Sequence, residues 1–377
     1  MSAAVFQSPS LLHLLLSAER GGCERCCAML IDHLPGARHT VFVLGPDGPM
    51  TAVFRSGGAE VEVVPAAEIR GGARLIAAVR RRVQTNRPAA AVAWHGLPQL
   101  PQLLTALKGG VANVGVYGGN PAHTMPRWVD WKFVLLGLRY PAPIPTYLCC
   151  SQYVADSFEA SRYLRRLPRV VVYNGVPVPE RGPHVPRAFD SDKPTVVGML
   201  ARLDVMKDHG TLIRAFALLR KSLPNARLEL AGGGDQRGPL EALAASLGIA
   251  GAVKFWGDVA DVYGVMSRWD AVGYATTERE GLGSALIEGM MLGLPVVATD
   301  VGPIREVCGR PGTGVLVPPH DPAALAAALA RLLPDLEMRQ KLSVAGRATA
   351  VELFHPATFA RRYAEVLRLP LPGRGAP

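Results

Sequence analysis

Short apolar segments alternate with amphipathic segments along the 377-residue chain, and this alternation restricts its fold more than any other feature. The apolar segments are short and rich in β-branched residues, as buried parallel strands are. They cover residues 11–17, 39–45, 60–65, 90–96, 112–119, 146–151 and 169–175, then 195–202, 228–234, 253–258, 271–277, 295–300 and 314–319. Helices are expected between them, for example over residues 127–138 and 153–164. Strands that alternate with helices predict parallel sheets covered by helices on both faces.

The alternating pattern stops near residue 177 and restarts near residue 195. The segment between them, 177–194, is rich in proline and charge and is typical of a linker. A chain of this length also predicts about two domains. We therefore expect an α/β protein with two Rossmann-like domains, residues 1–178 and 179–354, whose parallel sheets face a central cleft. Ligands of such sheets bind beyond the carboxyl ends of the strands, so we expect the chemistry in the loops that follow strands.

Two glutamates, Glu280 and Glu288, enclose the sequence EGLGSALIE after the strand candidate 271–277. A strand, a glycine-containing turn and a helix start together form an anion site, because free backbone N–H groups and the positive end of the helix dipole face it. Gly281 and Gly283 allow a ligand to approach the backbone closely. An anion site beside two carboxylates suits a nucleotide-sugar, whose phosphates bind the helix start and whose hydroxyls donate to carboxylates.

Other loops after strands carry further candidates. Arg202 and Lys207 follow the first strand of the second half, where two cations can bind a diphosphate as it leaves; two solvent-exposed charges are the alternative. Gly21 and Gly22 precede a helix, in a turn that suits phosphate or is simply tight.

Two further candidates are less specific. At the glycine run that contains Gly233, a ligand can lie against the backbone, although a turn alone would explain the glycines. Backbone groups around Trp256 can bind a nucleotide base, although a tryptophan that packs in the core is the alternative. His95 and His123 lie at or after strand ends of the first half, where a histidine can orient or deprotonate a hydroxyl or can be structural.

The net charge of +10 is concentrated in the first half. Residues 1–178 hold 18 Lys and Arg against 10 Asp and Glu, whereas residues 179–377 hold 23 against 21. The helix candidate 71–84 and the segment 162–169 carry much of the arginine. This half can bind an anionic membrane surface or an anionic acceptor, and a solvated arginine-rich surface explains it equally well. No nucleic-acid motif or interleaved aromatic residues accompany the charge, so we do not expect nucleic acid as a partner.

Membrane spans and metal sites are not expected. No apolar run reaches the roughly 18–20 residues of a membrane span, and residues 1–22 lack the basic region and cleavage site of a signal peptide. We expect a cytoplasmic protein, or one that lies on the inner face of the cytoplasmic membrane. Cys23 and Cys26 form a CxxC without a second pair at zinc-site spacing, so we expect the six cysteines to pack as small apolar residues.

These motifs in this order resemble the family-4 retaining glycosyltransferases. The matching sequences are GG-x-ER, VVYNGV, R-L-x-x-x-K, AGGGD, E-x7-E with GLPVVATDVGPIREV, and GVLVPP, and the resemblance is strongest between Met199 and Pro319. It implies a GT-B fold in which the first domain binds a hydroxyl acceptor and the second binds a nucleoside-diphosphate sugar. It also implies that the last helix, within 355–370, joins the first domain, and that no metal or other cofactor is needed.

The resemblance assigns roles to residues of this sequence. Glu280 would contact the hydroxyls of the donor sugar, Glu288 would hold the ribose, and Arg202 and Lys207 would bind the diphosphate. The backbone of Ser284, Ala285 and Leu286, together with Gly22, would complete the phosphate site. The sequence departs from the family at Gly118, where relatives often carry a histidine. That role would pass to His123 or Asn120 on the acceptor side, or be absent.

Three activities stay compatible with the sequence. The resemblance implies a retaining glycosyltransferase in glycan, glycolipid or natural-product biosynthesis. A nucleotide-sugar epimerase of the same fold and a scaffold that binds a sugar nucleotide without turnover are the alternatives. A glycan phosphorylase would need a pyridoxal lysine, for which the sequence has no motif.

Overall fold

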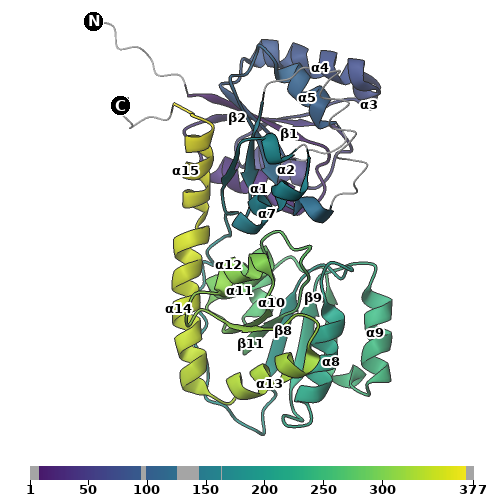
Figure 1. Cartoon of the computed structure of the whole chain (residues 1–377), viewed down its shortest axis with the longest axis vertical. Helices are drawn as coiled ribbons and strands as arrows, with labels where there is room; N and C mark the ends of the chain where they lie inside the picture. Colours follow the sequence, from purple (N-terminus) through teal and green to yellow (C-terminus); the bar gives the residue numbers. More distant parts are fainter. Residues whose placement is uncertain (1–7, 95–98, 125–143, 163, 371–377) are drawn as a thin grey trace, which may run out of the picture. The chain divides into compact units, whose positions relative to one another are not determined.

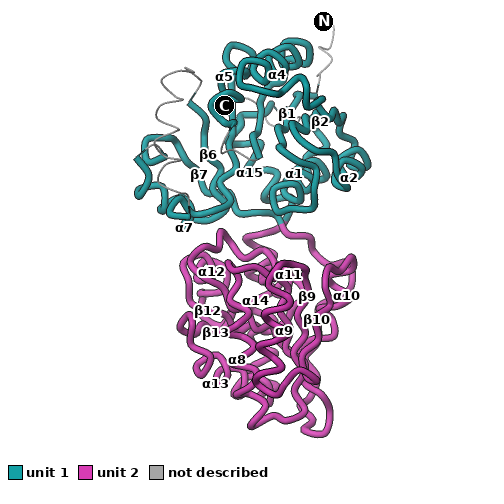
Figure 2. Tube along the Cα trace, turned by 90° about the vertical axis from the view of Figure 1, so that its right-hand side faces the viewer, with its two compact units in different colours: residues 1–175, 356–377 teal, residues 176–355 magenta. Residues whose placement is uncertain are grey.

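The computed structural model of the chain describes residues 8–94, 99–124, 144–162 and 164–370. The chain divides into two compact units: unit 1 comprises residues 1–175 and 356–377, and unit 2 comprises residues 176–355 (Figure 2). Each unit is built on one parallel sheet. The predicted α/β class, with two parallel-sheet halves, is confirmed.

Unit 1 contains a seven-stranded parallel sheet in the order β3-β2-β1-β4-β5-β6-β7. Its strands are β1 Ser10–Leu15, β2 Arg38–Val43, β3 Glu60–Val63, β4 Ala90–Ala93, β5 Asn113–Gly118, β6 Thr146–Cys149 and β7 Arg169–Val171. The central strands β1 and β4 are buried at every residue, which explains why their sequences are continuous apolar runs. The direction of winding reverses between β1 and β4, so the loops after these two strands flank a topological switch point.

Unit 2 contains a six-stranded parallel sheet in the order β10-β9-β8-β11-β12-β13. Its strands are β8 Val196–Leu200, β9 Arg227–Ala231, β10 Val253–Gly257, β11 Ala271–Tyr274, β12 Val296–Thr299 and β13 Val315–Val317. All thirteen strands of the two sheets coincide with the apolar segments predicted from the sequence. The winding of this sheet reverses between β8 and β11, which places a second switch point between the loops that follow them.

Helices separate the strands in both units (Figure 1). The described helices of unit 1 are α1 Gly22–His33, α2 Met50–Ser56, α3 Ala66–Ile69, α4 Gly72–Asn86, α5 Leu100–Leu107, α7 Gln152–Ser157 and α15 Pro356–Val366. Those of unit 2 are α8 His209–Leu219, α9 Arg237–Ser246, α10 Val262–Met266, α11 Ser284–Leu292, α12 Gly302–Cys308, α13 Pro322–Leu332 and α14 Leu336–Phe354. Within unit 2, α8 packs against α9 and α13, and α11 packs against α10 and α14.

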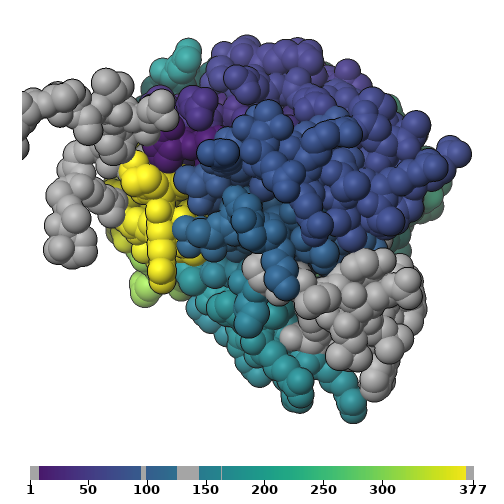
Figure 3. Space-filling model, turned by 90° about the horizontal axis from the view of Figure 1, so that it is seen from above, coloured from purple at the N-terminus to yellow at the C-terminus, as the bar shows by residue number. Residues whose placement is uncertain are grey.

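The helix α15 belongs to unit 1 although it comes last in the sequence. It packs against α1, and its Phe359 and Tyr363 lie in the same hydrophobic core as β1 and β4. The Tyr363 ring stacks on Trp94, with the ring centroids 5.5 Å apart and the planes inclined by 12°. In Figure 3 the yellow atoms of the C-terminal part lie beside the purple atoms of the N-terminal part.

One expected helix is shorter in the structure than predicted, and another lies outside the described residues. The segment 153–164 was expected to be one helix, but α7 ends at Ser157 and two 3₁₀ turns follow, Phe158–Ala160 and Leu164–Arg166. The side chain of Ser161 accepts the backbone N–H of Leu164 at 3.0 Å and starts a new turn, which interrupts the helix. The expected helix 127–138 lies outside the described residues.

Candidate functional site

The loops after β8 and β11 flank the switch point of unit 2 and are joined by hydrogen bonds. The backbone N–H of Asp208 donates to the carbonyl of Ala275 at 3.1 Å, and the Thr277 hydroxyl donates to the carbonyl of Met206 at 3.0 Å. An isolated antiparallel bridge also pairs Lys207 with Thr276. The two loops therefore act as one surface at the carboxyl ends of the strands, where the fold class places ligands.

This junction brings Lys207 and Glu280 together as a buried ion pair. The Lys207 ammonium is in direct contact with Oε2 of Glu280, and the two side chains are only 14% and 10% exposed. Oε2 of Glu280 also accepts the hydroxyls of Tyr274 at 3.0 Å and Thr276 at 3.2 Å. The Lys207 ammonium in turn donates to the Tyr274 oxygen at 3.1 Å. Three side-chain donors thus fix one oxygen of the carboxylate.

The other carboxylate oxygen is held more lightly. Oε1 of Glu280 accepts the backbone N–H of Gly281 at 3.2 Å. A carboxylate oxygen has two lone pairs, so Oε1 keeps capacity to accept a hydroxyl from a ligand. The geometry is that of a carboxylate aimed by one of its oxygens and able to bind a hydroxyl with the other.

The network sets the charge of its members. Burial alone would raise the pKa of Glu280, but the charge and hydrogen bond of Lys207, with the hydroxyls of Tyr274 and Thr276, bring that pKa below its usual value. Burial would lower the pKa of Lys207, yet Tyr274 and Glu280 outweigh it and the pKa of the ammonium is raised. The pair is therefore ionised near neutral pH, one fixed anion beside one fixed cation.

The helix α11 begins directly after this pair. Its N-cap, Gly283, has φ 86°, and a Cβ at that position would lie 2.7 Å from Cδ1 of Ile304, so the turn requires glycine. Within the part of the chain that the structure describes, the first-turn N–H groups of Ser284 and Ala285 have no protein acceptor, whereas the N–H of Leu286 donates to the carbonyl of Gly283 at 2.9 Å. Two free N–H groups at a helix start provide an anion-binding end.

Glu288 lies in the second turn of α11 and is half-buried. It therefore lies on the same helix whose start follows Glu280. The two glutamates of the sequence motif are placed on one continuous loop-and-helix segment, with the free N–H groups of Ser284 and Ala285 between them in sequence.

Arg202 is placed in the β8–α8 loop, but not on the Lys207–Glu280 pair. Its side chain is 74% exposed, and its guanidinium lies 2.8 Å from Oδ2 of Asp204. Oδ1 of Asp204 accepts the backbone N–H of Met206 at 2.9 Å, which shapes the turn that leads to Lys207. An exposed guanidinium near a shaped loop is free to reorient toward a ligand.

The glycine run after β9 packs against the same loop. Gly232 and Gly234 have φ of 128° and 152°, and a Cβ on either would lie about 2 Å from the carbonyl oxygen of Ala201 or Leu203. The N–H of Gly233 donates to Oδ1 of Asp258 at 2.9 Å. The run thus supports the Arg202 loop through close backbone contact, with the Gly233 N–H engaged by a side chain of its own unit.

Trp256 has a structural partner in unit 2. Its indole N–H donates to Oε2 of Glu229 at 3.0 Å, and the buried Trp269 donates to the same oxygen at 3.0 Å. Lys254 lies 3.3 Å from the Trp256 ring centroid, a cation–π contact. The Trp256 ring therefore packs among residues of its own unit.

In unit 1 the loop after β1 carries Gly21 and Gly22 at the start of α1. Glu24, which is only 3% exposed, accepts the Ser17 hydroxyl at 2.8 Å. A Cβ on Gly21 would lie 2.4 Å from Oε2 of Glu24, so the glycine leaves room for this buried carboxylate. Gly22 is thereby the first residue of a 12-residue helix, as an anion-binding turn requires.

The acceptor-side candidates follow β4 and β5. His123 lies in the 3₁₀ turn Ala122–Thr124 and meets Tyr153 edge-on, with centroids 6.0 Å apart. Asn120 is exposed in the same loop. His95 lies outside the described residues. The structure places His123 and Asn120 in the same loop after β5.

Sequence reasoning missed the residues that hold the pair in place, Tyr274 and Thr276. Tyr274 and Thr276 lie inside the predicted strand segment 271–277, whose apolar pattern indicates only a buried strand. The available signal was their position, because polar groups at the carboxyl end of a buried strand face the site.

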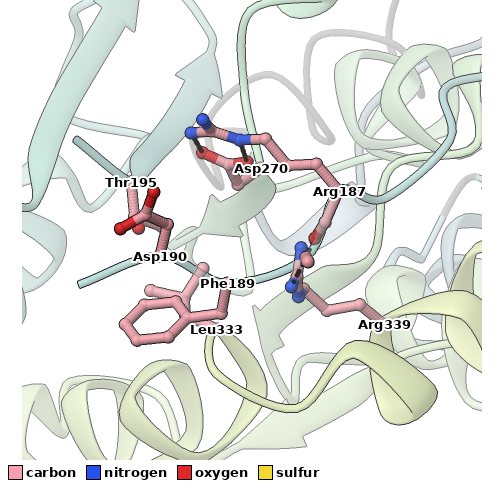
Figure 4. Close-up of a pocket in the computed structure, with 8 residues that line it drawn as sticks. Arg187, Phe189, Asp190, Thr195, Asp270, Leu333 and Arg339 are labelled. Atoms are coloured by element: carbon pink, nitrogen blue, oxygen red, sulfur yellow. Dashed lines mark hydrogen bonds and ion pairs between the residues drawn. The ribbon is translucent and has the colours of Figure 1, made fainter. Parts of the chain in front are cut away.

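A second polar cluster lies at the amino-terminal ends of β8 and β11, away from these loops (Figure 4). Arg187 binds Asp270 with two donors, at 2.9 and 3.1 Å, and the buried Arg339 donates to the carbonyl of Arg187 at 2.9 Å. The cavity beside them measures about 10 Å³, roughly the space of one water molecule. This cluster attaches the segment 177–194 to unit 2 and has no room for a sugar.

The described residues contain no group of three or more His, Cys, Asp and Glu side chains arranged to hold a metal ion. In the same residues no helix is long and apolar enough to cross a membrane.

Comparison with known proteins identifies both halves of the chain. Residues 20–179 match the family model described as Glycosyltransferase Family 4, and residues 185–349 match the model described as Glycosyl transferases group 1. EpsD of Bacillus subtilis is 35% identical over 158 residues, which are 42% of this chain and 41% of EpsD. The GDP-mannose-dependent alpha-(1-6)-phosphatidylinositol monomannoside mannosyltransferase of Mycolicibacterium smegmatis is 33% identical over 187 residues, 47% of this chain and 48% of that protein. The aligned region thus spans about half the length of these curated relatives.

Solved structures share the fold over nearly the whole chain. The crystal structure of Anabaena HepE in complex with UDP and glucose superposes with a TM-score of 0.78 at 22% identity, covering 96% of this chain and 99% of that one. WaaG, a glycosyltransferase involved in lipopolysaccharide biosynthesis, superposes with a TM-score of 0.67 at 18% identity, covering 95% and 99%. These likenesses show the GT-B fold. With a glycosyltransferase model matching each half, the chain belongs to the family-4 glycosyltransferases.

Proposed function

We propose that this chain is a retaining glycosyltransferase that transfers a sugar from a nucleoside-diphosphate sugar to a hydroxyl acceptor. The observation that carries the proposal is the buried Lys207–Glu280 pair next to the free N–H groups at the start of α11. One fixed anion suits sugar hydroxyls, and a fixed cation beside a helix start suits phosphate. The structure of HepE with UDP and glucose supports a donor of this class.

The proposed roles follow the chemistry of each group. Glu280 accepts hydroxyls of the donor sugar through Oε1, and Glu288 holds the ribose. Lys207, the α11 start and Arg202, once reoriented, bind the diphosphate, and Gly22 adds the start of α1. His123 and Asn120 serve the acceptor in the absence of a histidine at Gly118.

In the transfer step the bond between the sugar anomeric carbon and the diphosphate oxygen breaks. The acceptor oxygen bonds to the same face of that carbon, and its proton passes to the departing diphosphate. The protein contributes orientation and stabilisation of the negative charge that develops on the diphosphate. Lys207 supplies the positive charge for this, so we propose that transfer requires no metal ion or other cofactor.

The experiment is a nucleotide-release screen over UDP-, GDP-, ADP- and dTDP-sugars, repeated with EDTA. Glu280→Gln and Lys207→Met should each reduce turnover by about 100-fold or more, because each removes a group that stabilises the transition state. The matched controls are Glu337→Gln and Lys341→Met, which break an exposed pair on α14 and should leave turnover unchanged. Wild-type rates in the Glu280 and Lys207 variants would refute the assignment, and loss of activity in EDTA would refute the metal-free step.

A folding control separates catalysis from stability. Removing one partner of a buried ion pair leaves the other charge uncompensated, at a cost of about 3–5 kcal/mol. The double variant Lys207→Met with Glu280→Gln removes both charges, so it should recover much of the lost thermal stability while remaining inactive. Recovery of turnover in the double variant would contradict the roles given to both residues.

The alternative activities keep the same donor and differ in the products. An epimerase would convert the donor in the absence of any acceptor, and a scaffold would bind the donor without turnover. Product analysis with and without acceptor therefore distinguishes all three. The intact donor-side site favours the transferase.

We also propose that the basic half of the chain contacts an anionic membrane surface on the cytoplasmic side, as a transferase that acts on a lipid-linked acceptor would. The support is the charge surplus of residues 1–178 and the exposed Arg165 and Arg166. Part of the expected charge is neutralised, because Arg81 binds Glu68 and Arg82 binds both Glu62 and Glu68.

A further inference from the structure

Tyr274 is the last residue of β11 and is 1% exposed. Its hydroxyl accepts a hydrogen bond from the Lys207 ammonium at 3.1 Å and donates one to Oε2 of Glu280 at 3.0 Å. The ring also lies 5.6 Å from the Lys207 nitrogen, measured to its centroid. The phenol therefore touches both partners of the ion pair from the rigid end of a buried strand.

We propose that Tyr274 is a positioning residue of the sugar-transfer site, whose hydroxyl fixes Lys207 and Glu280 in one mutual arrangement. The inference rests on the proposed function, since it concerns the same two side chains. Lys207 and Glu280 come from loops 73 residues apart, and both have several rotatable bonds. A third group on a strand that binds both of them removes alternative arrangements of the pair.

The orientation of Glu280 is the main consequence. Tyr274 and Thr276 approach Oε2 from β11 and the residues after it, while Lys207 approaches the same oxygen from the β8–α8 loop. With Oε2 occupied in this way, Oε1 is the oxygen left to meet a ligand hydroxyl. Loss of the phenol hydroxyl would allow the carboxylate to rotate between its two oxygens.

Packing alone does not call for a hydroxyl at this position. Phenylalanine fills the same ring space, and a buried hydroxyl carries a desolvation cost unless it is hydrogen-bonded. Tyr363 in unit 1 provides the contrast, because its buried hydroxyl has no hydrogen-bond partner among the described residues. Tyr274 differs in that its hydroxyl is bonded to both members of the proposed site.

Among the residues that the structure describes, the titratable groups that face Glu280 are Lys207 and Tyr274. Behind them, His209 at the start of α8 is buried, which lowers its pKa to about 4, so it is neutral over the working range. The Tyr274 hydroxyl is one of the groups that lower the pKa of Glu280. Removing it should raise that pKa, so that activity requiring the ionised carboxylate is lost at a higher pH.

The test compares wild type, Tyr274→Phe and the matched control Tyr363→Phe. For Tyr274→Phe we expect kcat about tenfold lower, because misorientation acts on the reacting geometry, with the donor KM changed less than about threefold. The acid limb of its pH profile should move to higher pH. Tyr363→Phe should match wild type in kcat, KM and pH profile.

A second readout does not require turnover. The side-chain carboxyl signal of Glu280 in ¹³C NMR, identified by its loss in Glu280→Gln, reports the titration directly. The inference predicts a higher midpoint in Tyr274→Phe than in wild type. An unchanged midpoint, or a wild-type pH profile and kcat, overturns it.

The two hypotheses fail in different ways. If wild type turns over a donor and Glu280→Gln does not, but Tyr274→Phe behaves as wild type, the positioning role is wrong and the proposed function stands. If no donor is turned over, the proposed function fails, and the NMR midpoint still decides whether Tyr274 controls Glu280.

Discussion

At the scale of single residues, unit 1 contains a buried hydrogen-bond network that joins the side chains of Trp94, His13 and His39. Trp94 donates to Nδ1 of His13 at 3.0 Å, His13 and His39 are joined at 2.9 Å, and Nε2 of His39 lies 3.0 Å from the carbonyl of Leu34. The carbonyl is an acceptor, so Nε2 of His39 carries the proton and Nδ1 accepts from His13. This network therefore requires both histidine rings to be neutral, and burial lowers the pKa of both His13 and His39.

This hydrogen-bond network predicts that mild acidification lowers the free energy of unfolding. In the unfolded protein both histidines take up protons below about pH 6.5, whereas the folded rings stay neutral. The unfolded state then binds more protons, so the free energy of unfolding should fall as the pH drops from 7 toward 5. Urea unfolding at a series of pH values measures it. His13→Gln should show a smaller fall than wild type, and an equal fall would contradict the role of His13.

The site was only partly predictable at this scale. Glu280, Lys207 and the α11 start stand out in the sequence because their spacing follows a strand and a turn. The contact between Lys207 and Glu280 cannot be predicted from the sequence, because it depends on two loops that only the tertiary fold brings together. The role of Tyr274 could not be predicted, because a tyrosine inside an apolar strand is typical of a residue that packs in the core.

At the scale of elements, the strands were predictable because a buried parallel strand must be apolar throughout. The ends of helices were less predictable than the strands, because α7 ends at Ser157 and a new turn starts at Ser161. Sequence patterns also do not reveal which strand glycines serve contact with a neighbour. Gly198 in β8 is one of these, since Trp269 packs directly on it.

Gly198→Ala should therefore destabilise unit 2 strongly. A Cβ there would lie 1.9 Å from the Trp269 ring, and that ring is fully buried with its N–H bonded to Glu229. Because the ring has nowhere to move, we expect a loss of about 3 kcal/mol or more in the free energy of unfolding. Gly238→Ala in α9, where nothing lies within 4 Å, is the control and should be neutral or slightly stabilising. Similar unfolding midpoints for the two variants would argue against this packing.

At the scale of the whole molecule, the excess positive charge and the proposed donor site lie in different units. The proposed donor-side network of Lys207, Glu280 and α11 lies entirely in unit 2, whereas the surplus of positive charge lies in residues 1–178. Sequence composition predicted the charge surplus but not its neutralisation by Glu62 and Glu68, which requires the folded arrangement of α3, α4 and β3.

The membrane proposal predicts electrostatic binding through unit 1. The protein should sediment with vesicles that contain anionic lipid, less with neutral vesicles, and less again at high salt, because exposed charges are screened. Arg165→Glu with Arg166→Glu should weaken this binding more than the matched pair Arg220→Glu with Lys221→Glu in unit 2. Equal pelleting with neutral and anionic vesicles would remove the electrostatic argument.

The placement of α15 in unit 1 has a consequence for the synthesis of the protein. Phe359, Tyr363 and Leu367, with their neighbours in the C-terminal segment, complete a core whose other buried members lie between residues 11 and 172, including Leu11 and Trp94. A ribosome delivers those early residues long before it delivers the last helix. Unit 2 is continuous in sequence and can fold as soon as it emerges, whereas unit 1 must keep an apolar surface uncovered until residues 356–369 have been translated. The half that is made first is thus the half that is finished last.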